Sequence, residues 1–354
     1  MPLVYVFCFF ISLLLTLLFT PAAVFLSKKF GVYDMPNKRK VHSRPIPRWG
    51  GLAIFLSMLV CLILVYNIFP QFSHLLTSAL KQKSKLIGTL TLYDQLLGIL
   101  TGSTFVLILG MIDDKKNVQA MIKLLVQIIA ALVAMEYGVK IFGLTLPFFN
   151  KYIELPIILT LFVTVLWLIS FMNTINLADG LDGLATGIVT IAAGTFFIVS
   201  ILMKPSVAMN PDKMWLANQL QLSAILSITL CGAGIGFLFF NFNPATVFLG
   251  DGGALFMGFI LASISIMGTL KMPLVLALFI PVIIVALPVL DVFLSILRRF
   301  RRGSGIMEPD KEHIHHRLLK WGWTHREVVL IMYVITLMLS IITVSLTGWK
   351  LTLR

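Results

Sequence analysis

The chain has 354 residues, of which 58% are hydrophobic and only 12% are charged. A soluble domain carries about twice that charged fraction, and a water-soluble core of this size could not bury so much apolar surface. With a mean hydropathy of +0.98, the composition excludes an ordinary soluble enzyme and predicts one integral membrane domain over residues 1–354.

The net charge of +13 would ordinarily suggest nucleic acid as a partner. Here the basic residues lie in short loops between apolar segments. We therefore expect membrane lipids and phosphate-bearing substrates as partners, and no nucleic acid. Cys8, Cys61 and Cys231 lie far apart inside apolar runs, so they predict neither a disulfide framework nor a thiolate metal site.

Apolar runs long enough to cross a bilayer as helices follow one another along almost the whole chain. The predicted fold class is therefore all-α, a polytopic transmembrane bundle of about ten helices. The first run has no basic segment before it and no cleavage site after it, which predicts a retained helix rather than a signal peptide. In chain order the predicted helices cover residues 3–26, 51–70, 92–112, 120–136, 156–175, 184–203, 219–240, 253–268, 273–297 and 328–347.

Charge bias orients the predicted bundle. With the N-terminus outside, the cytoplasmic loops hold 18 of the 28 Lys and Arg residues, as the positive-inside rule requires. The same loops hold ten of the fifteen carboxylates. A transporter would spread such groups across the helix midplanes, so this clustering predicts an active site on the cytoplasmic face. The loops are residues 27–50, 113–123, 175–183, 241–252 and 298–327.

The first polar cluster follows the third predicted helix. Asp113 and Asp114 are adjacent, and neighbouring carboxylates repel each other unless a cation or a proton is bound. Lys115, Lys116 and Lys123 are near enough in sequence to hold phosphate oxygens. The pattern predicts a site that binds phosphate or Mg²⁺. The alternative is an acidic helix end that is solvated at the membrane interface.

The second cluster is the polar stretch at residues 173–183, which contains Asn176, Asp179 and Asp182. The two carboxylates would share one face if this stretch were helical. Gly180 and Gly183 permit a close backbone approach, and no Lys or Arg is present to pair with the acids. A functional loop is favoured over a simple polar turn.

The third cluster covers residues 241–254, where Asp251 lies in a glycine-rich turn just before a helix. Such a turn offers backbone N–H groups to an anion, and a carboxylate there suits a hard cation such as Mg²⁺. Phe248 could stack on a nucleobase, but the residue pattern alone favours an ordinary interfacial aromatic.

The fourth cluster lies at residues 309–318 and contains three histidines in four positions. Zinc is a weaker interpretation than contact with phosphate or nucleotide, because adjacent histidines on a helix point in different directions and no cysteine accompanies them. The histidines of the cluster are His313, His315 and His316, whereas His42, His74 and His325 are interpreted as ordinary surface or interface residues.

Together these segments resemble the polyprenyl-phosphate N-acetylhexosamine-1-phosphate transferase family, and the resemblance runs from about residue 3 to residue 347. The Asn-x-x-Asp-Gly-x-Asp-Gly loop at 176–183 and the Gly-Asp-x-Gly turn at 250–253 carry it in combination. Residues 313–318 and 41–51 resemble the undecaprenyl-phosphate GlcNAc-1-phosphate transferase branch rather than the related peptidoglycan translocase. Two departures are a longer outer loop after the second helix and Ala254 in place of a common serine.

The resemblance implies an Mg²⁺-dependent enzyme, with Mn²⁺ as a substitute metal. It would transfer N-acetylglucosamine 1-phosphate from UDP-GlcNAc to undecaprenyl phosphate or a similar polyprenyl phosphate and release UMP. The setting would be the bacterial inner (cytoplasmic) membrane, as the first membrane step of a teichoic acid or O-antigen type of polysaccharide. A phospho-MurNAc-pentapeptide transferase and a nucleotide-sugar or anion transporter stay open as alternatives, as does a homodimer.

The resemblance also implies roles for individual residues. Asp251 would bind Mg²⁺ on the diphosphate, Asp113 and Asp114 would hold or activate the lipid phosphate, and Phe248 would stack on uridine. The catalytic set is Asp113, Asp114, Asp182 and Asp251, and the metal ligands are Asp251, Asp113 and Asp114. The substrate-binding set is Asp34, Lys115, Lys123, Asn176, Asp179, Asn241, Phe248, His313, His315, His316 and Arg317.

The chemistry of the acceptor limits one of these roles. A phosphate monoester has a second pKa of about 6, so the lipid acceptor is mostly dianionic at neutral pH and scarcely needs a general base. We therefore expect catalysis by alignment and charge neutralisation, with Asp113 orienting the acceptor rather than removing a proton from it.

Overall fold

The computed structural model describes the chain except for residues 37–43, 85–87, 146–151, 269–321 and 353–354. The helices are α1 (Pro2–Lys29), α2 (Gly50–Ile68), α3 (Pro70–Leu76), α4 (Leu92–Lys116), α5 (Ala120–Glu136), α6 (Ile157–Ala178), α7 (Leu184–Ala208), α8 (Met214–Asn241), α9 (Gly250–Gly268) and α13 (His325–Thr352), with a 3₁₀ turn at Pro211–Lys213. Three short antiparallel hairpins pair β1 (Tyr33–Asp34) with β2 (Ile46–Pro47), β3 (Ala79–Ser84) with β4 (Gly88–Thr91), and β5 (Gly143–Thr145) with β6 (Tyr152–Glu154).

The predicted all-α membrane bundle is confirmed. Nine of the ten predicted helices are present at the expected places, and the tenth, at residues 273–297, lies outside the described residues. Eight described helices are long and apolar enough to span a bilayer. The exception among the nine is α5, which has 17 residues. The chain is thus a multi-pass membrane protein.

The third predicted helix is longer than its apolar run, and this difference matters for the site. Helix α4 begins with a capping box between Thr91 and Asp94 and continues through Lys116. It ends where Asn117 adopts a left-handed conformation with φ of 49°. Asp113 and Asp114 therefore lie on the last helical turn rather than in a loop.

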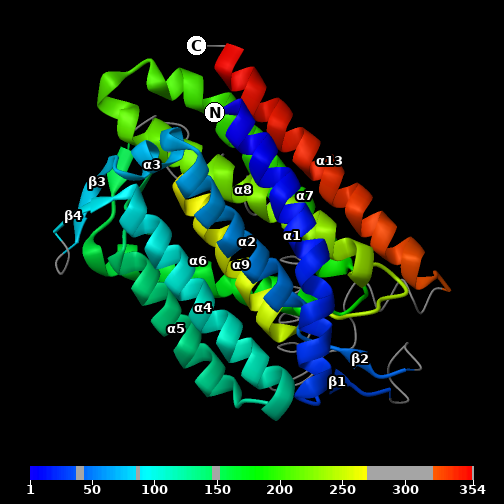
Figure 1. Ribbon diagram of the computed structural model, residues 1–354. Helices are drawn as coiled ribbons and strands as arrows, with labels where there is room; N and C mark the ends of the chain where they lie inside the picture. The colour runs from blue at the N-terminus through cyan, green and yellow to red at the C-terminus, as the bar shows by residue number, and fades with distance from the viewer. Residues whose placement is uncertain (37–43, 85–87, 146–151, 269–321, 353–354) are drawn as a thin grey trace.

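Helices α8 and α9 form the centre of the bundle, and α1, α6 and α13 lie on the outside (Figure 1). The outer helices expose large apolar side chains such as Leu14, Phe162 and Ile341. Inside the bundle, α7 and α1 pack against α8, and α4 and α6 pack against α9. Apolar side chains on the outer faces are what a lipid-facing surface requires.

The polar segments gather at one end of this bundle. In Figure 1 the end of α1, the β1–β2 hairpin, the end of α4 and the start of α9 lie at the bottom, whereas both chain termini lie at the top. The first and third polar clusters predicted from the sequence are therefore at the same end of the molecule, and Asp179 and Asp182 of the second cluster line one cavity with Gly250 of the third.

Candidate active site

Helix α4 meets helix α9 through two glycines, and this contact places their acidic residues together. A Cβ atom built on Gly110 of α4 would overlap the backbone nitrogen of Gly252 of α9. Gly51 of α2 approaches Gly253 of α9 in the same way. Only glycine allows backbones to come this close, so the two pairs hold the ends of three helices against one another.

Three carboxylates, those of Asp113, Asp114 and Asp251, meet at this contact. Asp114 Oδ1 accepts a hydrogen bond of 3.1 Å from the backbone N–H of Asp251. Asp113 Oδ1 accepts one of 2.7 Å from Val118 N–H. The side chains of Asp113 and Asp114 are 4% and 1% exposed, and that of Asp251 is 27% exposed. Two carboxylates are thus buried behind a third that water can reach.

Two basic side chains neutralise the acidic group. Lys123, on the first turn of α5, forms an ion pair with Asp113 and lies 3.7 Å from Asp251 Oδ2. Arg48, between β2 and α2, places Nε 3.2 Å from Asp114 Oδ1 and Nη2 3.7 Å from Asp251 Oδ1. Burial alone would lower the pKa of Arg48, but the surrounding carboxylates outweigh burial and raise this pKa. The guanidinium therefore stays charged.

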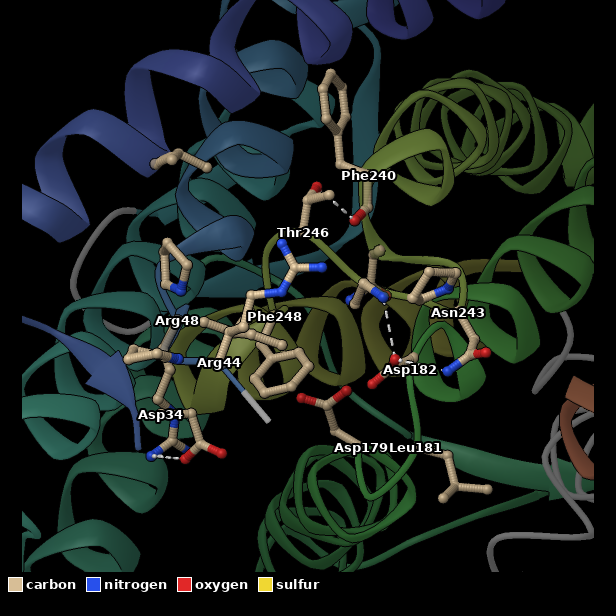
Figure 2. A pocket seen from close by; sticks show the side chains of 18 of the residues that line it. Asp34, Arg44, Arg48, Asp179, Leu181, Asp182, Phe240, Asn243, Thr246 and Phe248 are labelled. Atoms are coloured by element: carbon tan, nitrogen blue, oxygen red, sulfur yellow. Dashed lines mark hydrogen bonds and ion pairs between the residues drawn. The ribbon is translucent and has the colours of Figure 1, made fainter. Parts of the chain in front are cut away.

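A cavity of about 1070 Å³ opens beside this group (Figure 2). Its walls come from the end of α1, the β1–β2 hairpin, the α6–α7 loop, the α8–α9 loop and the start of α13. The lining residues are Pro21, Val24, Lys28, Asp34, Arg44, Pro45, Ile46, Pro47, Arg48, Asp179, Gly180, Leu181, Asp182, Phe240, Asn241, Asn243, Pro244, Ala245, Thr246, Phe248, Gly250 and His325.

Asp179 and Phe248 face each other across the middle of this cavity (Figure 2). Burial, and next the negative charge of Asp251, raise the pKa of Asp179 well above its usual value, while Arg48 opposes the change. A carboxyl group in this setting holds a proton more readily and can then donate a hydrogen bond to a ligand oxygen. The ring of Phe248 offers a flat apolar surface near it.

Asp182 connects three segments of the chain rather than pointing freely into the cavity. Its Oδ2 accepts hydrogen bonds of 3.0 Å from Asn243 Nδ2 and 3.1 Å from Ala245 N–H. Its own N–H donates to His325 Nε2 at 3.0 Å. The predicted shared helical face with Asp179 is absent, because α6 ends at Ala178 and Gly183 has a φ of 79°. The contacts of Asp182 make it a positioning residue for the α6–α7 loop and the α8–α9 loop.

Asn241 also has a structural setting. It is 2% exposed, its Oδ1 accepts from Thr186 Oγ1 at 2.9 Å, and its Nδ2 donates to Val247 O at 3.0 Å. Both polar atoms of the side chain are therefore engaged within the protein. These two bonds make Asn241 a support for the loop that carries Phe248, and its predicted substrate-binding role stays a prediction.

This role predicts the effect of truncation. Asn241→Ala leaves the buried Thr186 hydroxyl and Val247 carbonyl without partners, and we expect a loss of about 1–3 kcal/mol in the free energy of unfolding. Thermal denaturation of the detergent-solubilised protein measures it. The control is Asn67→Ala, since Asn67 is exposed and bonds only within α2. Equal melting temperatures for the two variants would contradict the supporting role.

The remaining predicted residues divide into three groups. Asp34 lines the cavity and lies 3.8 Å from Arg48 Nη1. Lys115 and Asn176 are not brought into the cluster: Lys115 Nζ lies 5.6 Å from the centre of the Phe30 ring, and Asn176 is partly buried near the end of α6 and does not line the cavity. His313, His315, His316 and Arg317 lie outside the described residues.

Arg48, Asn243 and His325 lie at the site but are not among the site residues predicted from the sequence. Arg48 could have been found, because an arginine directly before Trp49 and two glycines begins a membrane helix beside acidic loops. His325 gave no such signal, since its partner Asp182 is 143 residues away in sequence. Its interpretation as an ordinary surface or interface residue did not anticipate that it lines the cavity and accepts a hydrogen bond from the α6–α7 loop.

The carboxylates fit a hard cation by their chemistry. Asp114 Oδ2 is buried and has no hydrogen-bond partner among the described residues, and carboxylate oxygens are the ligands that Mg²⁺ prefers. Within the described part of the chain, no group of three or more acidic, histidine or cysteine side chains is spaced to hold a metal ion. Mg²⁺ is often bound by one or two carboxylates together with water and phosphate oxygens, so two carboxylates such as Asp114 and Asp251 are compatible with such an ion.

Comparisons with known proteins agree with this chemistry. A family model described as glycosyl transferase family 4 matches residues 96–269. A probable undecaprenyl-phosphate N-acetylglucosaminyl 1-phosphate transferase from Bacillus subtilis (strain 168) is 33% identical over 341 residues, covering 96% of this chain and 84% of the relative. A decaprenyl-phosphate N-acetylglucosaminephosphotransferase from Mycobacterium tuberculosis (strain H37Rv) is 34% identical, covering 87% and 74%. A phospho-N-acetylmuramoyl-pentapeptide-transferase from Halalkalibacterium halodurans is 30% identical, covering 96% and 95%.

Proposed function

Because this chain belongs to the polyprenyl-phosphate N-acetylhexosamine-1-phosphate transferase family, we propose that it transfers N-acetylglucosamine 1-phosphate from UDP-N-acetylglucosamine to a polyprenyl phosphate such as undecaprenyl phosphate. The observation that carries this proposal is the meeting of Asp113, Asp114 and Asp251 with Arg48 and Lys123. This charged group borders a cavity of about 1070 Å³, which is large enough for a nucleotide sugar.

The proposed reaction is a single phosphoryl displacement. An oxygen of the acceptor phosphate forms a bond to the β-phosphorus of the nucleotide sugar. The bond between that phosphorus and the bridging oxygen breaks, and UMP leaves with the electron pair. No proton has to be removed from a dianionic acceptor, so the protein's task is to align two anionic substrates and offset their charge.

Each part of the site has a role in this reaction. Arg48 and Lys123 would hold phosphate oxygens, and Phe248 would stack on the uracil ring. Asp179 would bond to the sugar phosphate. Mg²⁺, held by Asp251 and Asp114, would supply positive charge to the diphosphate and to the leaving UMP. Asp182 would hold the α6–α7 loop and the α8–α9 loop together around the nucleotide.

Asp113 is proposed to orient rather than to act as a base. Both of its oxygens are engaged, one by Val118 N–H and the other by Lys123, so neither is free to take a proton. Asp113→Asn is therefore expected to lower kcat by about 10- to 100-fold without changing the shape of the pH–rate profile. The measurement is kcat between pH 5.5 and 9. An acidic limb in the wild type that disappears in the variant would show that Asp113 is a general base.

We place the active site on the cytoplasmic side of a bacterial cytoplasmic membrane. The bias of Lys and Arg toward the loops that the sequence predicts to be cytoplasmic supports that orientation, and the relatives described above are bacterial. The product would begin a cell-envelope polysaccharide of the teichoic acid or O-antigen type.

The test is UMP release by the purified full-length chain with Mg²⁺ and polyprenyl phosphate. UDP-N-acetylglucosamine, UDP-N-acetylgalactosamine and UDP-MurNAc-pentapeptide are supplied in separate assays. The pentapeptide is included because the Halalkalibacterium relative matches along 95% of its length. Release from UDP-N-acetylglucosamine alone is the expected result, and release from the pentapeptide alone identifies the second candidate. No release, together with uptake of a nucleotide sugar into vesicles, would refute the transferase proposal.

A further inference from the structure

Arg48 occupies the middle of the acidic group in an unusual way. Its three guanidinium nitrogens face three different carboxylates: Nε lies 3.2 Å from Asp114, Nη2 3.7 Å from Asp251 and Nη1 3.8 Å from Asp34. Only the first distance is close to that of a hydrogen bond. The side chain is therefore held firmly by Asp114 and loosely by the other two acids.

The backbone of Arg48 is fixed by contacts with other segments of the chain. Its N–H donates to Ser27 Oγ at 3.2 Å, and the neighbouring Trp49 donates from Nε1 to Met111 O at 3.2 Å. A Cβ atom on Gly250 would overlap the Arg48 carbonyl oxygen, so α9 packs directly against this backbone. The side chain is 29% exposed and lines the cavity wall, so a ligand in the cavity can reach it where it stands.

Asp114 still lacks a partner for its second oxygen. The Asp114 side chain is 1% exposed, and Oδ2 has no hydrogen-bond partner within the described residues. A buried carboxylate oxygen without a donor or a cation is costly. Arg48 thus neutralises the charge of Asp114 through Oδ1 but leaves Oδ2 without a hydrogen-bond donor or a cation among the described residues.

From these contacts we propose that Arg48 is a placeholder cation, which holds the Asp114 and Asp251 carboxylates until a divalent ion replaces it and which then turns to the substrate diphosphate. This inference rests on the proposed function for its second half only. A divalent ion needs the same carboxylate oxygens, so the guanidinium and the ion compete for them. A diphosphate in the cavity attracts the guanidinium as the ion displaces it, because arginine matches phosphate geometry with two parallel donors.

The proposal predicts opposite effects of one substitution on metal binding and on catalysis. Arg48→Gln removes the competing charge, so the variant is expected to bind Mn²⁺ about two- to fivefold more tightly than the wild type, which corresponds to the free energy of one partly exposed ion pair. The same variant is expected to release UMP at least about tenfold more slowly, because the diphosphate loses its cation. A residue with a merely structural role would weaken both properties.

Mn²⁺ binding is measured by electron paramagnetic resonance on the detergent-solubilised full chain with no substrate present. Lys29→Gln is the control, since Lys29 is an exposed basic residue at the end of α1, and its removal deletes one positive charge from the same end of the bundle. The affinity of this control for Mn²⁺ should equal that of the wild type. Because the binding measurement uses no substrate, it decides the placeholder role even if the chain transfers a different sugar or none.

Each outcome decides the proposal. Tighter Mn²⁺ binding by Arg48→Gln with an unchanged Lys29→Gln supports it, and equal or weaker binding overturns it. If the glutamine variant does not fold, Arg48→Met keeps the length of the side chain and gives the same comparison. Failure of both uncharged variants to fold would mean that Arg48 is required for the folded state, and the placeholder role would be abandoned.

Discussion

Asp251→Asn is expected to lower kcat for UMP release by about 100- to 1000-fold while leaving the folded bundle intact. Asp251 is the one member of the carboxylate group that water reaches, with 27% of its side chain exposed, and it is the first acid that an incoming cation or diphosphate would meet. Loss of one group that stabilises developing charge typically costs that much in rate. The substitution keeps the shape of the side chain, so α9 should still begin at Gly250.

The measurement is the steady-state rate of UMP release, with thermal denaturation as a check that the fold survives. Asp212→Asn is the matched control, because Asp212 is an exposed carboxylate in the turn between α7 and α8. The control should behave as the wild type. A kcat for Asp251→Asn within a few-fold of the control would remove Asp251 from the catalytic group.

Gly110→Ala is expected to damage both stability and activity although it adds a single methyl group. A Cβ atom on Gly110 would overlap the backbone of Asp251 and Gly252, and backbone atoms cannot move aside as a flexible side chain can. Helix α4 must therefore separate from α9, at a cost of about 1–3 kcal/mol in the free energy of unfolding. The separation also moves Asp113 and Asp114 away from Asp251, and a displacement of about 1 Å in such a site can cost about 100-fold in rate.

Gly194→Ala is the control for this prediction. It is the same substitution in another membrane helix, but a Cβ atom there would lie 3.7 Å from Cys231 Sγ, which is an ordinary contact. Melting temperature in detergent and the rate of UMP release are measured for both variants. Similar values for the two would mean that the α4–α9 contact does not set the geometry of the site.

Some of the features on which stability and activity depend can be predicted from the sequence, and others cannot. The helices could be predicted because about 20 apolar residues are needed to cross a bilayer, a requirement that each run either meets or does not. The end of α4 was missed for the same reason. Asp113 and Asp114 interrupt the apolar run, whereas the helix continues until the left-handed Asn117.

The sequence by itself also determined which segments are polar and on which end of the bundle they lie, because loop order and the number of membrane crossings leave little freedom. Asp113, Asp114, Asp179, Asp251 and Phe248 all reach the predicted end of the molecule and adjoin one cavity or its acidic border.

Only the tertiary structure decided what each polar side chain touches. The amides and acids of the loops look alike in sequence, but Asn241 bonds to Thr186 and Val247 and Asp182 bonds to Asn243 and Ala245, while Asp179 faces the cavity. Arg48 forms ion pairs with Asp114 and Asp251, and His325 accepts a hydrogen bond from Asp182, although these partners are far apart in sequence. Such pairings depend on how the helices pack, and the close glycine contacts that fix this packing carry no local pattern that marks their partners.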